Sequence, residues 1–129
     1  MIPTNTDIAK LLLRISTGVF ILFHGIHKVI HGIGGVKAML SSAGLPELLA
    51  YGVYLGEIIA PIFIILGLYA RVAAGVLGVN MLMAMFLAYG FSFSLGKYGG
   101  LAMESPLSFL IMSILIALLG SGKYSVNNK

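Results

Sequence analysis

Hydrophobic residues follow one another in four long runs, separated by short polar or glycine-rich stretches. A helix that crosses a bilayer needs about 20 mostly apolar residues, and each run is of about that length. The predicted spans are residues 8–30, 47–69, 71–91 and 104–120. We therefore predict an all-α integral membrane four-helix bundle, formed by a single domain over residues 1–129.

The breaks between the runs predict how the helices are connected. The stretch 31–46 is rich in glycine and ends in proline, so it separates the first two spans, the first of which has Asp7 as its predicted N-cap. The turn around Arg71 is so short that the third span must return antiparallel to the second. Residues 92–103 form the last loop. This order predicts an up-down antiparallel bundle with both termini on the same side.

Basic residues bias the orientation of this bundle. Five of them lie on the side of the termini, and three lie in the opposite loops. The five are Lys10, Arg14, Arg71, Lys123 and Lys129, and the three are Lys28, Lys37 and Lys97. Because lysine and arginine concentrate on the cytoplasmic side of a membrane, we expect cytoplasmic termini.

The composition agrees with a membrane protein and excludes several functions. Hydrophobic residues make up 59% of the chain and charged residues 9%, whereas soluble domains have about 45–50% and about 25%. The basic residues are scattered, so nucleic acid is not an expected partner. The absence of cysteine excludes disulfides and thiol catalysis by this chain. A redox role therefore requires a bound cofactor or a partner protein.

Glu57 is the most informative residue, because a charge at mid-span costs at least about 2.5–3.5 kcal/mol on insertion scales. At about 1.5 Å per residue, it lies about 18 Å from the cytoplasmic end of its span. Arg14 and Asn80 lie at about 9 and 14 Å, and His24 at about 24 Å. Three interpretations stay open: a structural ion pair with Arg14, a carboxylate that handles protons or anchors a ligand, and an uncharged hydrogen-bonded acid.

Polar residues form one stripe along the first span, at alternating steps of four and three residues. Its members are Lys10, Arg14, Thr17, Ile21, His24 and Lys28. At about 100° per residue these positions share one helix face, and a mostly polar face should avoid lipid. We expect this stripe to face the bundle interior, where Glu57 meets it.

Small residues recur every four positions in two of the spans. They are Gly52, Gly56 and Ala60 in one, and Ala70, Ala74 and Gly78 in the other. This spacing is typical of membrane helices that pack closely, so we interpret both sets as packing seams.

The histidines allow several interpretations. His27 and His31 have the four-residue helical spacing seen in zinc sites. Such a site needs three or four ligands, and no cysteine or aspartate lies nearby, so we predict no metal site. Haem binding is also disfavoured, because no histidine lies outside this cluster. Two readings stay open: interfacial histidines without specific chemistry, or His24 and Lys28 as donors to a quinone carbonyl or a lipid phosphate.

The chain resembles the DoxX family of small four-helix bacterial membrane proteins over nearly its whole length. The matching elements, in order, are "LLLRISTGVFILFHGIHK", "AGLP", "GEIIAPIFIILGLYAR", "GG" at 99–100 and "ESPLSFLIMSILIALLGSGKYSV". Arg14, His24, Lys28 and Glu57 match the polar positions of the family. Glu104 follows Gly99-Gly100 at a longer spacing than in the family pattern.

The resemblance implies a multi-pass protein of the bacterial cytoplasmic (inner) membrane with a tie to redox metabolism. Some members look like subunits of thiosulfate:quinone oxidoreductases, and others like partners of membrane oxidoreductase assemblies. The wider superfamily is similar to membrane chaperones and cargo receptors, which carry out no chemistry. No catalytic residue transfers from the resemblance, so enzymatic activity is left unassigned.

Two functional hypotheses follow. The first is an accessory or quinone-interacting subunit of a membrane oxidoreductase system, which needs a partner subunit. Its hypothetical ligand-binding residues are Arg14, His24, Lys28, Glu57, Asn80 and Glu104. The second is a non-enzymatic assembly, chaperone or lipid-binding protein. In either case we expect the lipid bilayer as a partner, with a homo-oligomer as a further candidate, and quinone is the candidate cofactor.

Overall fold

The computed structural model describes residues 4–127, so Lys129, one of the five basic residues counted above, lies outside it. The described residues are all-α, with no strand beyond one isolated bridge between Leu95 and Leu101. The elements are α1 (Asn5–His31), α2 (Gly34–Ser42), η1 (Glu47–Tyr51), α3 (Gly52–Tyr54), η2 (Leu55–Ile59), α4 (Ala60–Leu66), α5 (Ala70–Tyr89) and α6 (Glu104–Leu119).

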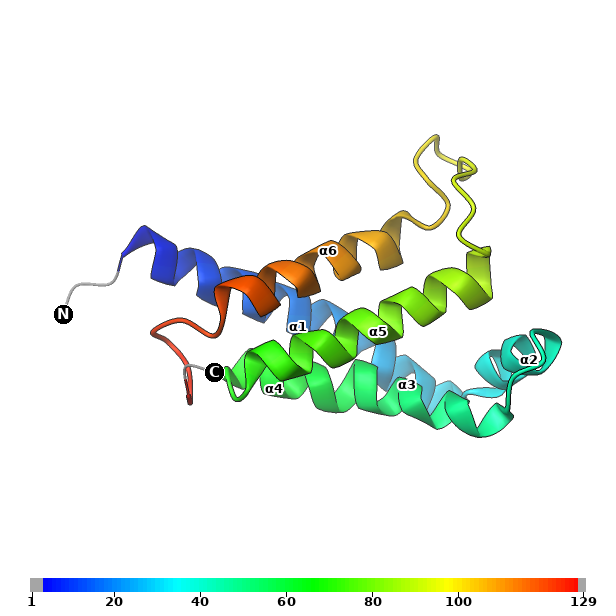
Figure 1. Cartoon of the computed structure of the whole chain (residues 1–129), viewed down its shortest axis with the longest axis horizontal. Helices are drawn as coiled ribbons and strands as arrows, with labels where there is room; N and C mark the ends of the chain where they lie inside the picture. Colours follow the sequence, from blue (N-terminus) through cyan, green and yellow to red (C-terminus); the bar gives the residue numbers. More distant parts are fainter. Residues whose placement is uncertain (1–3, 128–129) are drawn as a thin grey trace.

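Three helical segments are long and apolar enough to cross a membrane: α1, the continuous segment Glu47–Leu66 from η1 to α4, and α5. The apolar helix α6 is shorter, with 16 residues. Helix α1 packs against α4 and α6, and α5 packs against the same two. Figure 1 shows α2 and the loop before α6 at the end of the structure opposite the start of α1.

The first helix begins earlier than expected. Its N-cap is Thr4, not Asp7. The Asp7 backbone N–H donates to Thr4 Oγ1 at 3.1 Å, and the Thr4 backbone N–H donates to Asp7 Oδ2 at 3.1 Å. Aspartate thus occupies the third helical position of a capping box, where its carboxylate binds backwards to the cap residue.

The predicted break at 31–46 contains a helix, α2, that the glycine content concealed. Its Leu40 is buried with Ile33 and Ala50, so one apolar side of α2 packs on η1. The prediction gave more weight to the helix-breaking glycines of this stretch than to its apolar residues, which are spaced to form one side of a helix. The following span ends at Leu66 instead of residue 69, because Gly67 adopts a left-handed conformation with φ 69°, which is common just after a helix.

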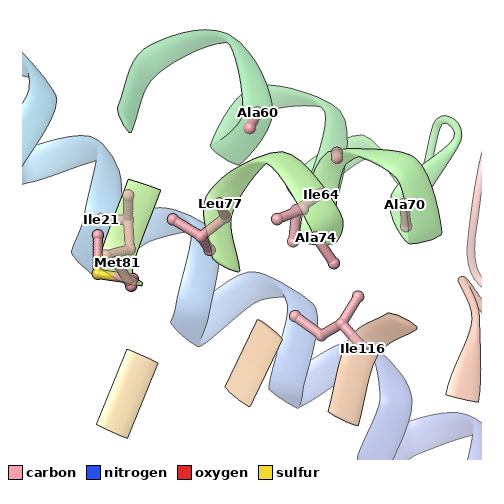
Figure 2. Close-up of a cluster of buried hydrophobic side chains, with 9 residues drawn as sticks. Ile21, Ala60, Ile64, Ala70, Ala74, Leu77, Met81 and Ile116 are labelled. Carbon is pink, nitrogen blue, oxygen red and sulfur yellow. The ribbon is translucent and has the colours of Figure 1, made fainter. Parts of the chain in front are cut away.

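The main core lies where α1, α4, α5 and α6 meet. Figure 2 shows Ile21 of α1, Ile64 of α4, Leu77 of α5 and Ile116 of α6 converging on it. Alanines line the α4–α5 contact and keep these helices close: Ala60, Ala70, Ala73 and Ala74 are all buried. Small residues of this kind let membrane helices approach closely.

Two glycines let α1 touch the second segment directly. A Cβ atom on Gly18 would overlap the side chain of Ile65. One on Gly25 would overlap the backbone carbonyl of Glu57. The bare backbone of α1 therefore sets its distance from η2 and α4.

Arg14 is buried, 2% exposed, and joins three parts of the chain. Its Nε donates to the Ile64 carbonyl at 3.0 Å and its Nη2 to the Ile65 carbonyl at 3.0 Å. Its Nη1 donates to the carbonyls of Ser121 at 2.7 Å and Tyr124 at 2.9 Å. The last carbonyls of a helix lack donors within the helix and favour a cation. The guanidinium thus supplies hydrogen-bond donors to the C-terminal end of α4 and holds the C-terminal segment against it.

We expect Arg14→Met to lower the free energy of unfolding by at least about 2 kcal/mol, since a hydrogen bond from a charged group contributes about 1.5–3 kcal/mol. Residues 120–127 should also become more susceptible to protease. Thermal unfolding and limited proteolysis of the detergent-purified protein measure both effects. A variant with wild-type stability and a protected C-terminal segment would contradict this role.

A matched pair of glycine variants tests the α1 contact. Gly25→Ala should destabilise the protein by about 1–3 kcal/mol, the usual effect of overpacking. Gly75→Ala on α5 should be neutral or stabilising, because no atom lies within 4 Å of the added Cβ and alanine favours a helix. Equal melting temperatures for the two variants would refute the close approach at Gly25.

Candidate functional site: a buried ion pair beside an apolar cavity

Glu57 lies on an irregular turn within the second membrane segment. In an α-helix its carbonyl would accept a hydrogen bond from the N–H four residues later, but that residue is Pro61, which has none. The chain widens here into a π-helical turn, η2, in which the Ala60 N–H donates to the Leu55 carbonyl. Single π turns of this kind often occur at functional sites. The sequence prediction treated this span as regular, and Pro61 was the signal that it missed.

Both carboxylate oxygens of Glu57 are bound by side chains of other helices. Lys28 Nζ lies 2.6 Å from Oε1, and Asn80 Nδ2 donates to Oε2 at 2.9 Å. The Glu57 side chain is 5% exposed and that of Lys28 28%. The predicted inward orientation of Glu57 is thus observed, but its cationic partner is Lys28 and not Arg14.

Helix geometry explains why Lys28 is the partner. Gly25 contacts the Glu57 backbone, and Lys28 follows it by three residues, on the same face of α1. Side chains of a helix lean toward its N-terminus, so the lysine stem brings its ammonium back to the level of Glu57. Arg14 lies about three turns before Gly25 on α1 and binds the end of α4.

Gly56 brings Asn80 to the carboxylate. A Cβ atom on Gly56 would lie 2.6 Å from Asn80 Cβ, so only glycine lets α5 approach η2 this closely. The seam predicted at Gly56 thus has a second consequence, because it delivers the amide of α5 to Glu57.

The cluster borders a cavity of about 800 Å³, within the range of about 300–1,000 Å³ typical of small-molecule sites. Its walls come from α2, from η1 to η2 and from one face of α5, and they are mainly aliphatic. Its polar side chains are Lys28, Glu57 and Asn80. An apolar chamber with a few convergent polar groups is the usual form of a ligand site.

The short helix α2 closes one end of this cavity with Val36, Met39 and Leu40. Its Lys37 ammonium donates a hydrogen bond to the Tyr51 hydroxyl of η1 at 3.1 Å. This hydrogen bond raises the pKa of Lys37 above its ordinary value. The contact ties α2 to η1, so both belong to the same wall.

The remaining predicted ligand residues lie elsewhere. Arg14 is occupied by backbone carbonyls, as described above. His24 is exposed, and its ring meets Phe109 of α6 edge-on with centroids 6.1 Å apart. Glu104 is exposed at the start of α6. Of the six predicted residues, the structure brings Lys28, Glu57 and Asn80 together.

The other two histidines lie at the end of α1, with ring centroids 4.3 Å apart. Among residues 4–127, no group of three or more histidine, aspartate or glutamate side chains is arranged to hold a metal ion.

Comparison with known proteins identifies the family of this chain. The model of the DoxX family matches residues 9–90, which include Lys28, Glu57 and Asn80. A protein of Bacillus subtilis (strain 168), described as "Putative oxidoreductase CatD", is 29% identical over 115 residues, covering 89% of this chain and 81% of the relative. No solved structure matches significantly. The family match and the three membrane-length apolar helices agree: this multi-pass membrane protein belongs to the DoxX family.

Proposed function

We propose that the protein is a quinone-binding membrane subunit of an oxidoreductase system. Family membership and the relative described as an oxidoreductase support the redox association. The observation that carries the proposal is the Lys28–Glu57–Asn80 cluster, which opens into an otherwise apolar cavity of about 800 Å³.

The residues of the cavity fit a quinone. A quinone ring is flat and apolar, with carbonyl oxygens that accept hydrogen bonds. The Lys28 ammonium has three N–H donors and the Asn80 amide two, and Glu57 accepts one from each. Both groups thus retain donors for a ligand carbonyl, while aliphatic side chains cover the ring.

The chain itself then binds the ring and manages protons. When bound, a quinone supplies two-electron redox chemistry coupled to two protons. Lys28 and Asn80 orient its carbonyl. The Glu57 carboxylate is placed to hold a proton at Oε1 or Oε2 and to exchange it with the bound ring. The chain has no cysteine, and we propose that a partner protein exchanges electrons with the ring.

The depth of the cluster favours a quinone over a phospholipid head group. Glu57 and Asn80 lie near the middle of the helical segments Glu47–Leu66 and Ala70–Tyr89, about 15 Å from either end at 1.5 Å per residue. A phospholipid phosphate stays at the membrane surface, whereas a quinone ring enters the hydrocarbon. The alternative function, a non-enzymatic assembly or lipid-binding protein, gains no support from this depth.

We also propose how the protein sits in the membrane: four helices in up-down order in the bacterial inner membrane, with cytoplasmic termini. The fourth helix, α6, is about 24 Å long at 1.5 Å per residue. Its packing against α1 and α5 supports a fourth span. The excess of basic residues near the termini supports the orientation.

Quinone binding tests the proposed function. Asn80→Leu should weaken binding about tenfold, the effect of losing roughly one hydrogen bond to the ring. Glu57→Gln should weaken it by a similar factor, because glutamine carries no charge to hold the Lys28 ammonium in position. His24→Ala is the matched control and should bind as wild type, because His24 does not line the cavity. The affinities are obtained by measuring the quinone that the purified protein retains over a series of quinone concentrations. Circular dichroism shows that each variant is folded.

Two results would reject this site. One is equal affinity in all four proteins, and the other is no binding by the wild type. A partner protein that is retained in detergent without bound quinone would instead favour the non-enzymatic function.

The absence of cysteine allows a direct test of orientation. The single-cysteine variant Asn5→Cys places a thiol in the first turn of α1. The variant Lys97→Cys places one in the loop before α6. In intact cells, a membrane-impermeant maleimide should label Lys97→Cys only, and permeabilised cells should label both. External labelling of Asn5→Cys alone would reverse the orientation, and labelling of both would reject the three spans that separate the two positions.

A further inference from the structure

The cavity continues along α5 as a groove. The α5 residues that line it recur at steps of three and one, from Val72 to Ala88, so they form one continuous face of the helix. At 1.5 Å per residue this face is about 24 Å long, with Asn80 at its midpoint. The groove therefore extends about 12 Å from the polar cluster in each direction.

The two halves of the groove differ in their cover. Toward α2 it is a chamber, because α2, Leu49 and Val53 face the helix across the cavity. Toward the α4–α5 turn the lining comes from α5 itself, and Val72 and Val79 are 68% and 65% exposed. In a bilayer, the half toward the α4–α5 turn is open to acyl chains.

Glycines lie in both halves, with open space in front of them. Gly52 lines the chamber and Gly75 lines the open half. No atom lies within 4 Å of a Cβ atom built on either residue. These glycines contrast with Gly25 and Gly56, whose missing side chains make room for protein atoms. At Gly52 and Gly75 the missing side chains leave room for a ligand.

We propose that Gly75 forms the floor of a lateral portal, through which the isoprenoid tail of a bound quinone runs out into the bilayer while its ring occupies the chamber beside Gly52. This inference rests on the proposed quinone site and adds the direction and the exit of the tail. In the opposite direction α2, Leu49 and Val53 enclose the cavity. Beside Gly75 the groove is open sideways, since Val72 and Val79 are exposed, so an apolar tail can leave there into the hydrocarbon.

Gly75 is thus a specificity-determining position for tailed ligands, and Gly52 for the ring. A leucine at position 75 would occupy the path of the tail and leave the chamber unchanged. A leucine at position 52 would fill the chamber itself. Since both positions are open, neither substitution should disturb helix packing.

The test compares two quinones with the same ring. Menadione has no tail, and a menaquinone carries a polyisoprenoid tail on the same naphthoquinone. In nanodiscs, Gly75→Leu should weaken menaquinone binding about tenfold, the effect of excluding about two methylene groups, and leave menadione binding within about twofold of wild type. Gly52→Leu should weaken both. Unchanged melting temperatures show that the variants are folded.

The outcomes separate this inference from the proposed function. If wild type binds neither quinone, the quinone site itself is rejected. If wild type binds both, and Gly75→Leu alters neither or alters both equally, the portal is rejected and the quinone site stands. If Gly75→Leu abolishes the binding of oleate and leaves menaquinone binding unchanged, the occupant of the portal is a fatty acyl chain, which overturns the isoprenoid assignment.

Discussion

The arrangement of this protein depends on one constraint, which is that a carboxylate near the middle of a membrane segment must have both of its oxygens bound. Glu57 meets this condition with Lys28 of α1 and Asn80 of α5. Each donor requires its helix to come unusually close, so Gly25 and Gly56 lack side chains at those contacts. One acidic residue thus fixes the positions of two neighbouring helices, and the cavity lies beside this contact, between α5, α2 and the segment from η1 to η2.

Two cationic side chains of α1 have separate tasks, at different depths. Arg14, with its planar fork of donors, binds two backbone carbonyls near the end of α4 and two of the C-terminal segment. Lys28, a compact charge on a flexible stem, reaches one carboxylate oxygen and stays partly accessible. Arg14 uses four of its five N–H donors on backbone carbonyls, whereas Lys28 retains N–H donors beside the cavity. The chemistry of the two residue types suits this division.

Much of this could be predicted from the sequence, because membrane spans and the placement of Glu57 follow from hydrophobic length and helical rise alone. The partner of Glu57 could not, since side-chain reach along the helix decided between Arg14 and Lys28. Pro61 is present in the sequence, but the hydrophobic pattern predicts a regular helix there and not a π turn. Small-residue spacing predicted a packing seam at both Gly52 and Gly56, and of these two only Gly56 makes a close helix contact. It did not distinguish a glycine that admits another helix from one that leaves space.

Stability alone is a weak explanation for the Lys28–Glu57 pair. Replacing a buried ion pair by well-packed apolar residues is often neutral or stabilising, because desolvation offsets much of the attraction between the charges. A purely structural pair would also be best served by complete packing around it, which keeps water and ligands away. Here the pair borders a cavity of about 800 Å³, and its lysine side chain is 28% exposed. The surroundings of the Lys28–Glu57 pair are therefore not those of a fully packed structural ion pair.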